Sequence, residues 1–307
     1  MTARRLFGPD VLGPEVASHC AVPTPLILED RVRVFVSSRD NKGRSRAYAV
    51  DLDRDDLGSL IATSGPVLDL GQPGHFDEDG TMPSSAVRLP DGRIRLYYVG
   101  WNRASGSVSY RVSIGSAISD DGLYFRREFD GPLLDRSHDE PILATTPFVE
   151  PVLEGYEMTY CSGTRWINAG GNLEPCYRLA RAESADGIVW RRTGSLTLPL
   201  ESEAITRPII VRVKGRRYLA CSHRGSIGYR DDPQHGYKLA FLAEDGDGWS
   251  ITDDNFRPLG DEAWCKVMRC YGYVVELGGS HVLLYNGDGF GASGVLAAPL
   301  AFGGGVL

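Results

Sequence analysis

A unit of about sixty residues recurs along this chain, and the repeat constrains the fold more than any other feature. Three segments share an alanine, a polar bend, an Asp-Gly pair and an aromatic residue: AISDDGLYF (117–125), AESADGIVW (182–190) and AEDGDGW (243–249). The Asp-Gly pairs begin at Asp121, Asp186 and Asp247, so they lie 65 and 61 residues apart. Asp-Gly is a strong tight-turn signal, because glycine accepts a positive φ and aspartate bonds the turn backbone.

A second unit, two alternating apolar strands around a short polar turn, occurs five times. The five predicted hairpins cover residues 22–40, 82–102, 146–166, 206–225 and 269–289. Their turns are predicted at Glu29-Asp30, Asp91-Gly92, Glu154-Gly155, Lys214-Gly215 and Gly278-Gly279. Further strands follow each hairpin, and no helical stripe persists over three turns.

The repeat therefore predicts an all-β fold: a five-bladed β-propeller with four-stranded antiparallel blades, forming one domain over residues 1–307. A β-sandwich is the alternative architecture for strands of this length. An interaction scaffold of the WD-repeat type is disfavoured, because a sixty-residue blade is too long for that repeat.

Composition excludes several classes of function. The net charge of −7 disfavours nucleic acid as a partner, because binding phosphates along a strand needs a basic face. No apolar run is long enough for a signal peptide or a membrane span, and the six cysteines form no CxxC pair, which predicts a cytoplasmic protein with reduced thiols. The motifs of nucleotide loops, zincins and calcium loops are missing, so no metal and no cofactor is predicted; the oligomeric state is left open.

Propeller geometry brings the starts of the first strands and the ends of the second strands together at the central channel. These positions are rich in arginine, aromatic, asparagine and serine side chains, which bind anions, sugar rings and hydroxyls. Packing between blades or surface ion pairs is the alternative role for each of them. The predicted ligand-binding residues are Arg39, Ser84, Trp101, Arg165, Trp166, Arg207, Arg224, Tyr285 and Asn286.

Candidate catalytic groups occur at the same level. Asp77 and Asp79 come just before one channel strand, and Glu203 comes before another. Glycoside hydrolysis needs two carboxylates on opposite sides of a pocket, one protonated and one charged. His19 is a further candidate, as a general base or a hydroxyl partner, although a single histidine is more often structural. The alternative for the Asp77–Asp79 segment is a solvated acidic turn.

The chain resembles the five-bladed propeller glycosidases related to glycoside hydrolase families 43 and 32, and within them a bacterial subgroup of uncertain activity found among sugar biosynthesis genes. The resemblance is carried by HFDEDGTMPSSAV (75–87), LYYVGWN (96–102), YRVSIGSAISDDGLYF (110–125), YCSGTRW (160–166), ITRPIIV (205–211) and LLYNGDGFG (283–291). It implies a pocket at the channel mouth, with a blade-one aspartate as base or nucleophile, a second aspartate that tunes it and a glutamate as acid.

The chain departs from that pattern at the acidic positions. Blade one has His19 to Pro23 where an acidic residue is expected, Thr206-Arg207-Pro208 carries no glutamate, and Val267 occupies another acidic position. The main hypothesis is a glycoside hydrolase-like enzyme that acts on an anionic sugar or sugar nucleotide through channel-mouth carboxylates. The alternative is a non-hydrolytic propeller, which binds a sugar or metabolite or rearranges or cyclises a pathway intermediate.

Overall fold

The computed structural model describes residues 2–302, whose strands pair as five antiparallel sets of four, here called blades one to five. Blade one is β2 (Ser18–Ile27), β3 (Arg31–Arg39), β4 (Ser45–Asp53) and β5 (Leu60–Leu68); blade two is β6 (Gly80–Arg88), β7 (Ile94–Arg103), β8 (Tyr110–Ser119) and β9 (Arg126–Arg127). Blade three is β10 (Ala144–Val152), β11 (Gly155–Ala169), β12 (Asn172–Ser184) and β13 (Arg191–Ser195); blade four is β14 (Ala204–Val213), β15 (Arg216–Arg224), β16 (Lys238–Asp245) and β17 (Gly248–Phe256). Blade five is β18 (Cys270–Leu277), β19 (Ser280–Asn286), β20 (Val295–Leu300) and β1 (Arg4–Phe7).

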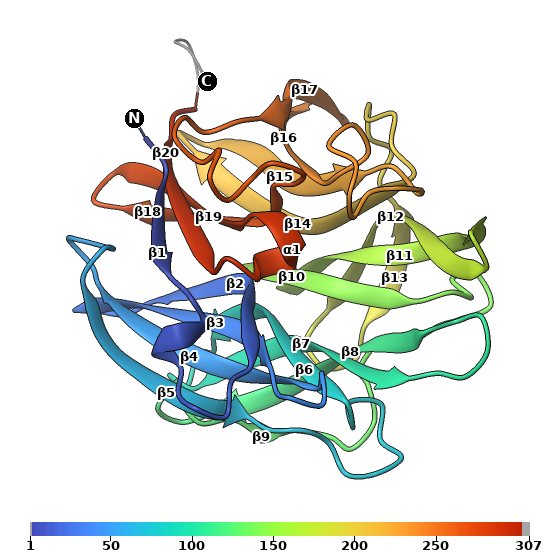
Figure 1. Ribbon diagram of the computed structural model, residues 1–307, viewed down its shortest axis with the longest axis horizontal. Helices are drawn as coiled ribbons and strands as arrows, with labels where there is room; N and C mark the ends of the chain where they lie inside the picture. Colours follow the sequence, from blue (N-terminus) through green and yellow to red (C-terminus); the bar gives the residue numbers. More distant parts are fainter. Residues whose placement is uncertain (1, 303–307) are drawn as a thin grey trace.

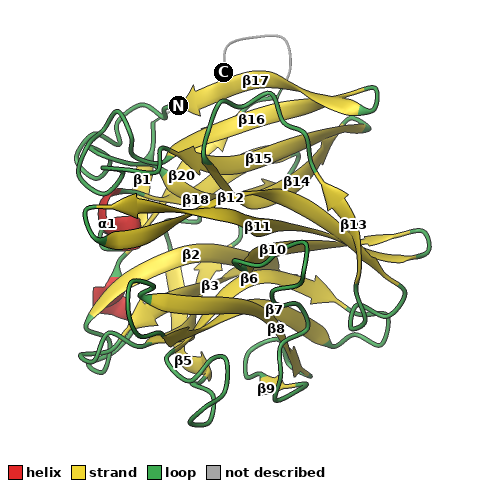
Figure 2. Ribbon diagram, turned by 90° about the vertical axis from the view of Figure 1, so that its right-hand side faces the viewer, coloured by secondary structure: helices red, strands yellow, loops and turns green. Residues whose placement is uncertain are grey.

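The blades surround a common centre, and the first strands β2, β6, β10, β14 and β18 lie innermost (Figure 1). The helical segments in the described part of the chain are the short η1 (Pro9–Val11) and α1 (Asp288–Gly291), as Figure 2 makes visible. The predicted all-β propeller is confirmed, and each predicted hairpin forms the first two strands of one blade. Within residues 2–302, no helix is long and apolar enough to cross a membrane.

The Asp-Gly repeats mark the turn between the third and fourth strands of a blade. The carboxylate of Asp121 accepts hydrogen bonds from the amides of Leu123 and Tyr124, and Asp186 accepts the same pair from Ile188 and Val189. In blade four, Asp247 instead lies in a tight hairpin, between the paired Asp245 and Gly248.

The last blade contains both ends of the described chain. β1 pairs with β20 through Arg4↔Ala297, Arg5↔Leu296 and Phe7↔Val295. The ring of blades is therefore closed by hydrogen bonds between segments almost three hundred residues apart.

Apolar clusters fill the spaces between neighbouring blades. One of them joins blades one and five and includes Val34 and Tyr48 of blade one with Phe7, Leu284 and Val295 of blade five. All six cysteines are free thiols, and all are buried.

Backbone irregularities recur on the innermost strands at one level of the channel. Val22, Thr146, Arg207 and Tyr271 have positive φ angles of 52°, 44°, 54° and 57°, and pairing shifts register beside each of them. Positive φ is costly for residues with a Cβ, and most of all for a β-branched residue such as Val22. A proline or glycine follows each of the four residues. The hydrogen-bonded pairing between the first and second strands of the blade is therefore interrupted at these points.

Arg207 lies where these irregular segments meet. Its Nη1 donates to the carbonyl and hydroxyl of Ser84 at 2.9 and 2.8 Å. Its Nη2 donates to the carbonyl of Pro23 and the hydroxyl of Thr24, both at 2.8 Å. Ser84 donates in turn to the carbonyl of Pro147, so one guanidinium connects the innermost strands of blades one, two and four and, through Ser84, reaches blade three.

We expect Phe7→Ala to lower the free energy of unfolding by about 3 kcal/mol, because it leaves a cavity in the cluster that closes the ring. Urea unfolding measures the difference. Arg4→Ala is the control from the same strand, because the Arg4–Asp56 ion pair is more than half exposed and contributes below about 1 kcal/mol. Equal costs for the two variants would contradict a closing role for Phe7.

Candidate functional site

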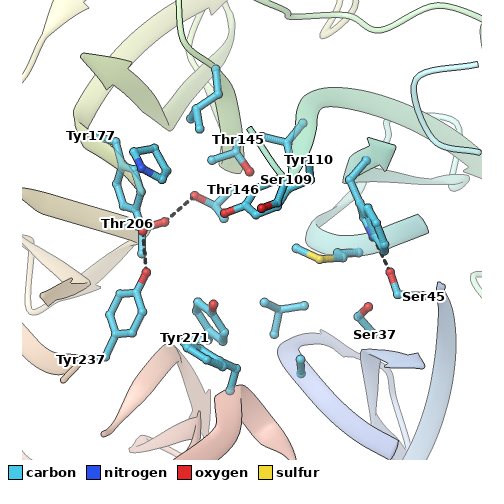
Figure 3. A pocket seen from close by; sticks show the side chains of 18 of the residues that line it. Ser37, Ser45, Ser109, Tyr110, Thr145, Thr146, Tyr177, Thr206, Tyr237 and Tyr271 are labelled. Atoms are coloured by element: carbon cyan, nitrogen blue, oxygen red, sulfur yellow. Dashed lines mark hydrogen bonds between the residues drawn. The ribbon is translucent and has the colours of Figure 1, made fainter. Parts of the chain in front are cut away.

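A cavity of about 560 Å³ opens on the channel axis, on the side of the innermost strands where each of them begins. All five innermost strands contribute to its wall, through Ala21, Val22, Met82, Thr145, Thr146, Thr206 and Tyr271. The second strands add Ser37, Arg39, Trp101, Arg103 and Arg224, and the third strands with their preceding loops add Ser45, Ser109, Tyr110, Val112, Pro175, Tyr177, Tyr229, Arg230 and Tyr237. Figure 3 shows hydroxyl groups from several blades around the open centre.

The two halves of the cavity differ in chemistry. The side formed by blades three to five is aromatic, with Tyr177, Tyr229, Tyr237, Tyr271 and Phe290 in mutual contact. The opposite side carries the hydroxyls of Ser37 and Ser45 (Figure 3), beside Trp101. Rings and hydroxyls together are suited to a sugar, whose faces are apolar and whose edges are polar.

The charged side chains that line the cavity are all positive. Four arginines line the cavity, and within residues 2–302 no aspartate or glutamate lines it. Arg103 is paired with Asp79 at 2.7 Å and Arg230 with Glu174 at 2.6 Å. Arg39 and Arg224 have no carboxylate partner in the described chain, so the cavity carries uncompensated positive charge in a protein whose net charge is −7.

Three of the residues predicted to bind ligand line this cavity: Arg39, Trp101 and Arg224. The Trp101 indole nitrogen donates to the Ser45 hydroxyl at 2.7 Å, which holds the ring on the wall. These three side chains reach the cavity from blades one, two and four.

Asp77 does not line the cavity. Its carboxylate is fully buried in blade two, where Oδ2 accepts hydrogen bonds from the Tyr98 hydroxyl at 2.8 Å and from Arg127 Nε at 2.7 Å. Gly71 and Gly100 pack so closely on Asp77 that a Cβ on either would collide with its side chain. The surroundings of Asp77 are those of a structural ion pair.

Asp79 and Glu203 do not share a pocket. Asp79 stands behind Arg103, accepting its backbone amide at 2.8 Å as well as its guanidinium. Glu203 lines a separate cavity of about 270 Å³, where it accepts the amide of Ser226 and contacts Arg165 at 3.4 Å. The side-chain placements of these two carboxylates therefore give no pair that faces across the axial cavity.

His19 lies on β2 beside the cavity but outside its lining. Its backbone has a φ of 69°, and its Nδ1 lies 2.7 Å from the Ser18 hydroxyl. Burial, reinforced by the nearby Arg39 cation, lowers the pKa of His19 to about 4. The ring is thus neutral at physiological pH.

The remaining predicted binding residues lie outside the cavity wall. Ser84 and Arg207 belong to the buried network around the channel. The hydroxyl of Tyr285 bonds Asp261, and the amide of Asn286 bonds the carbonyls of Cys20 and Gly294, which ties blade five to blade one. Arg165 is exposed beside Glu203, and Trp166 is partly buried farther along β11.

Six aromatic residues of the cavity are not among the residues predicted from the sequence, and all but Tyr271 lie on third strands or in the segments that lead to them: Tyr110, Tyr177, Tyr229, Tyr237, Tyr271 and Phe290. In an antiparallel blade the third strand begins where the second ends, so the start of the third strand also reaches the channel mouth. Ser45 and Tyr110 begin such strands and Tyr237 directly precedes one, whereas Tyr177 lies five residues into β12, beside the start of β14. An aromatic residue at this repeat position was the available signal.

Within residues 2–302, no group of three or more histidine, cysteine or acidic residues is arranged to hold a metal ion. The arginines of the axial cavity only donate hydrogen bonds and its hydroxyls can donate them, which suits an anion instead.

Asp77→Asn is expected to lower the free energy of unfolding by about 3 kcal/mol, because Arg127 loses its buried partner. Chemical denaturation measures the loss. Asp120→Asn is the matched control, since the Asp120–Arg126 pair is exposed and contributes below about 1 kcal/mol. An Asp77→Asn protein of unchanged stability would contradict the structural role.

His19→Asn is expected to reduce the loss of stability in acid. The folded-state pKa of His19, about 4, lies below the unfolded value of 6.5, so the unfolded chain binds the proton more readily. His19 therefore costs stability progressively as pH falls from 6.5 to 4. Asparagine tolerates the positive φ and does not titrate there. Melting temperatures across this range test the effect, and parallel curves for the two proteins would contradict it.

No protein-family model matches the chain. The uncharacterized protein Rv1502 of Mycobacterium tuberculosis (strain ATCC 25618 / H37Rv) is 30% identical over 297 residues, which cover 94% of this chain and 95% of that protein. A solved structure described as a glycoside hydrolase superimposes on the chain with a TM-score of 0.75 and 16% identity, covering 100% of this chain and 94% of the other.

Two further solved structures have the same fold. A thermostable family-43 glycoside hydrolase gives a TM-score of 0.68 at 16% identity, with 98% of this chain and 94% of that chain covered. The sucrose-6-phosphate hydrolase of Lactobacillus gasseri gives 0.67 at 13%, with 94% and 61% covered. The chain therefore belongs to the same family as the uncharacterized protein Rv1502, and it has the β-propeller fold of the family 43 and 32 glycoside hydrolases.

Proposed function

We propose that the axial cavity binds an anionic sugar or a closely related anionic metabolite, and that its chemistry is not two-carboxylate glycoside hydrolysis. One observation carries the proposal. The lining contains four arginines, aromatic rings and hydroxyls, and within the described residues it contains no carboxylate. Two-carboxylate hydrolysis requires an acid and a base on opposite sides of the scissile bond.

The positions of the sequence-predicted carboxylates support the second half of the proposal. Asp77 is held by Arg127, Asp79 by Arg103, and Glu203 lines a different cavity. Each carboxylate has a cationic or amide partner already, and none of them projects from the wall on which a sugar would lie. The glycosidase-like scaffold would then serve as a binding frame for other chemistry.

Cavity size and charge support the first half. A volume of about 560 Å³ lies in the range of small-molecule sites and accommodates a sugar bearing a charged substituent. Arg39 projects into the cavity without a carboxylate partner in the described chain, and arginine binds phosphate or carboxylate in bidentate fashion. Among proteins of the same fold, the Lactobacillus gasseri hydrolase is named for a phosphorylated sugar.

Anionic sugars are expected to raise the melting temperature of the protein. At a hundredfold excess over the dissociation constant, binding adds about 2.7 kcal/mol, or a shift of about 5 °C for a chain of this size. Thermal unfolding with glucose 6-phosphate, glucuronate or UDP-glucose measures the shift, against glucose at matched ionic strength. Equal stabilisation by glucose would contradict a site for anions.

Arg39→Gln is expected to weaken the binding of the same ligands about tenfold, because one charge-assisted contact is lost. Arg126→Gln is the control, since Arg126 is exposed on β9 outside the cavity. Product analysis on anionic glycosides tests the chemistry. Hydrolysis that disappears in Asp79→Asn and Glu203→Gln proteins of normal stability would overturn the proposal and restore the carboxylate mechanism.

A further inference from the structure

One corner of the cavity is formed by Tyr177 on β12, Tyr237 just before β16 and Arg224 at the end of β15. The two phenol oxygens lie 2.5 Å apart, and Arg224 Nε donates to both of them, at 3.2 Å to Tyr177 and 3.1 Å to Tyr237. Figure 3 shows the two rings meeting at their hydroxyls on one side of the open centre, across from Ser37 and Ser45.

We propose that Tyr177, Tyr237 and Arg224 form an oxyanion site, which binds the phosphate or carboxylate group of the cavity's ligand. The inference rests on the proposed function and specifies it, because it assigns the anionic end of the ligand to the aromatic half of the cavity. The sugar ring then lies toward Ser37, Ser45 and Trp101.

The number of hydroxyl protons at the corner shows how many hydrogen bonds it can donate to a ligand. Two phenols bring two O–H protons, and a tyrosine hydroxyl donates once. One proton bridges the two oxygens, and both oxygens already accept from Arg224 Nε. Within residues 2–302 no acceptor receives the second hydroxyl proton. Since Tyr177 and Tyr237 both line the cavity, that proton is available to a ligand oxygen there.

The positive charge of Arg224 also favours an anion at this corner. The side chain is buried, and its neutral partners are the two phenols and the carbonyls of Gly225 and Pro175, at 2.8 and 3.3 Å. No carboxylate of the described chain pairs with it. A buried cation without a counter-ion is costly, and an anion bound beside it offsets that cost.

Packing behind the corner keeps it in place. The Tyr229 ring stacks with two guanidinium groups, whose Cζ atoms lie 3.7 Å (Arg224) and 4.3 Å (Arg230) from the ring centroid. Glu174 holds the far side of this stack, bonding the Tyr229 hydroxyl at 2.8 Å and Arg230 at 2.6 Å. The donors are thus fixed before a ligand arrives, which reduces the entropy lost on binding.

The corner donates protons and does not accept them at neutral pH. Burial raises the pKa of Tyr177 well above its usual value, and burial also raises that of Tyr237. Both phenols therefore stay protonated through about pH 9. Anion binding should accordingly be constant between about pH 7 and 9, whereas a histidine donor, which titrates near pH 6.5, would already have lost most of its charge at the lower end of this range.

The test compares Tyr177→Phe, Tyr237→Phe and the double variant by isothermal titration with glucose 6-phosphate and with glucuronate, and with inorganic phosphate as the minimal probe. Each single change leaves one hydroxyl, whose proton is freed from the bridge and can still reach the ligand, so the single variants are expected to bind nearly as well as the wild type. The double variant has no hydroxyl left and is expected to bind about tenfold more weakly. Comparing the two sugars shows whether phosphate or carboxylate is preferred. Tyr273→Phe is the control, because Tyr273 lies outside the lining and makes no side-chain hydrogen bond with the described residues.

The outcomes separate this inference from the proposed function. If the wild-type protein binds anionic sugars and the double phenylalanine variant binds equally well while Arg39→Gln does not, the anion lies at Arg39 and the oxyanion site is overturned. If the wild-type protein binds no anionic sugar, the proposed function fails as well. Should the phenylalanine variants misfold, Arg224→Lys keeps the charge but loses the Nε–H bridge, and unchanged affinity in that variant overturns the site.

Discussion

The buried guanidinium of Arg207 is the contact on which the centre of the propeller depends. Four donated hydrogen bonds from one side chain reach two other innermost strands, and burial lowers the pKa of Arg207 to about 10. A charge in such a place needs acceptors directed at it. The interrupted pairing at Pro23 and Ser84 supplies them, because a carbonyl released from its ladder is free to accept from another strand.

The same irregular segments determine the floor of the cavity. Val22, Thr146 and Tyr271, which take positive φ, are also cavity residues, so the backbone distortion and the site occur at one level. Unfavourable backbone geometry concentrated around a pocket is typical of functional sites. Here the irregular segments of three blades contribute Val22, Thr146 and Tyr271 to the cavity, and that of a fourth contributes the buried Arg207, which lies outside the lining.

The repeat and the hairpins could be predicted well from the sequence, because turn residues and alternation act over a few neighbours. Asp-Gly turns and polar loops between apolar runs indicated all five hairpins. The hydrogen-bond partners of individual side chains could not be predicted in this way. The pairing of Asp77 with Arg127 spans 50 residues, and Arg207 reaches Pro23 across 184, so neither could be inferred from local pattern. For the same reason, local pattern does not reveal that β1 completes blade five, or that Tyr177 and Tyr237 reach the cavity.

Pairing of β1 with β20 has a consequence for how the protein is made. Arg5 meets Leu296, so the ring cannot close on the ribosome until Leu296 has emerged. Until then the apolar edge between blades one and five is open, and it is the surface on which premature association would occur. Since β1 and β20 lie side by side, the circular order of the blades is independent of where the chain is cut. A circular permutant that starts at another blade would keep the axial cavity and would change only the blade in which the chain closes the ring.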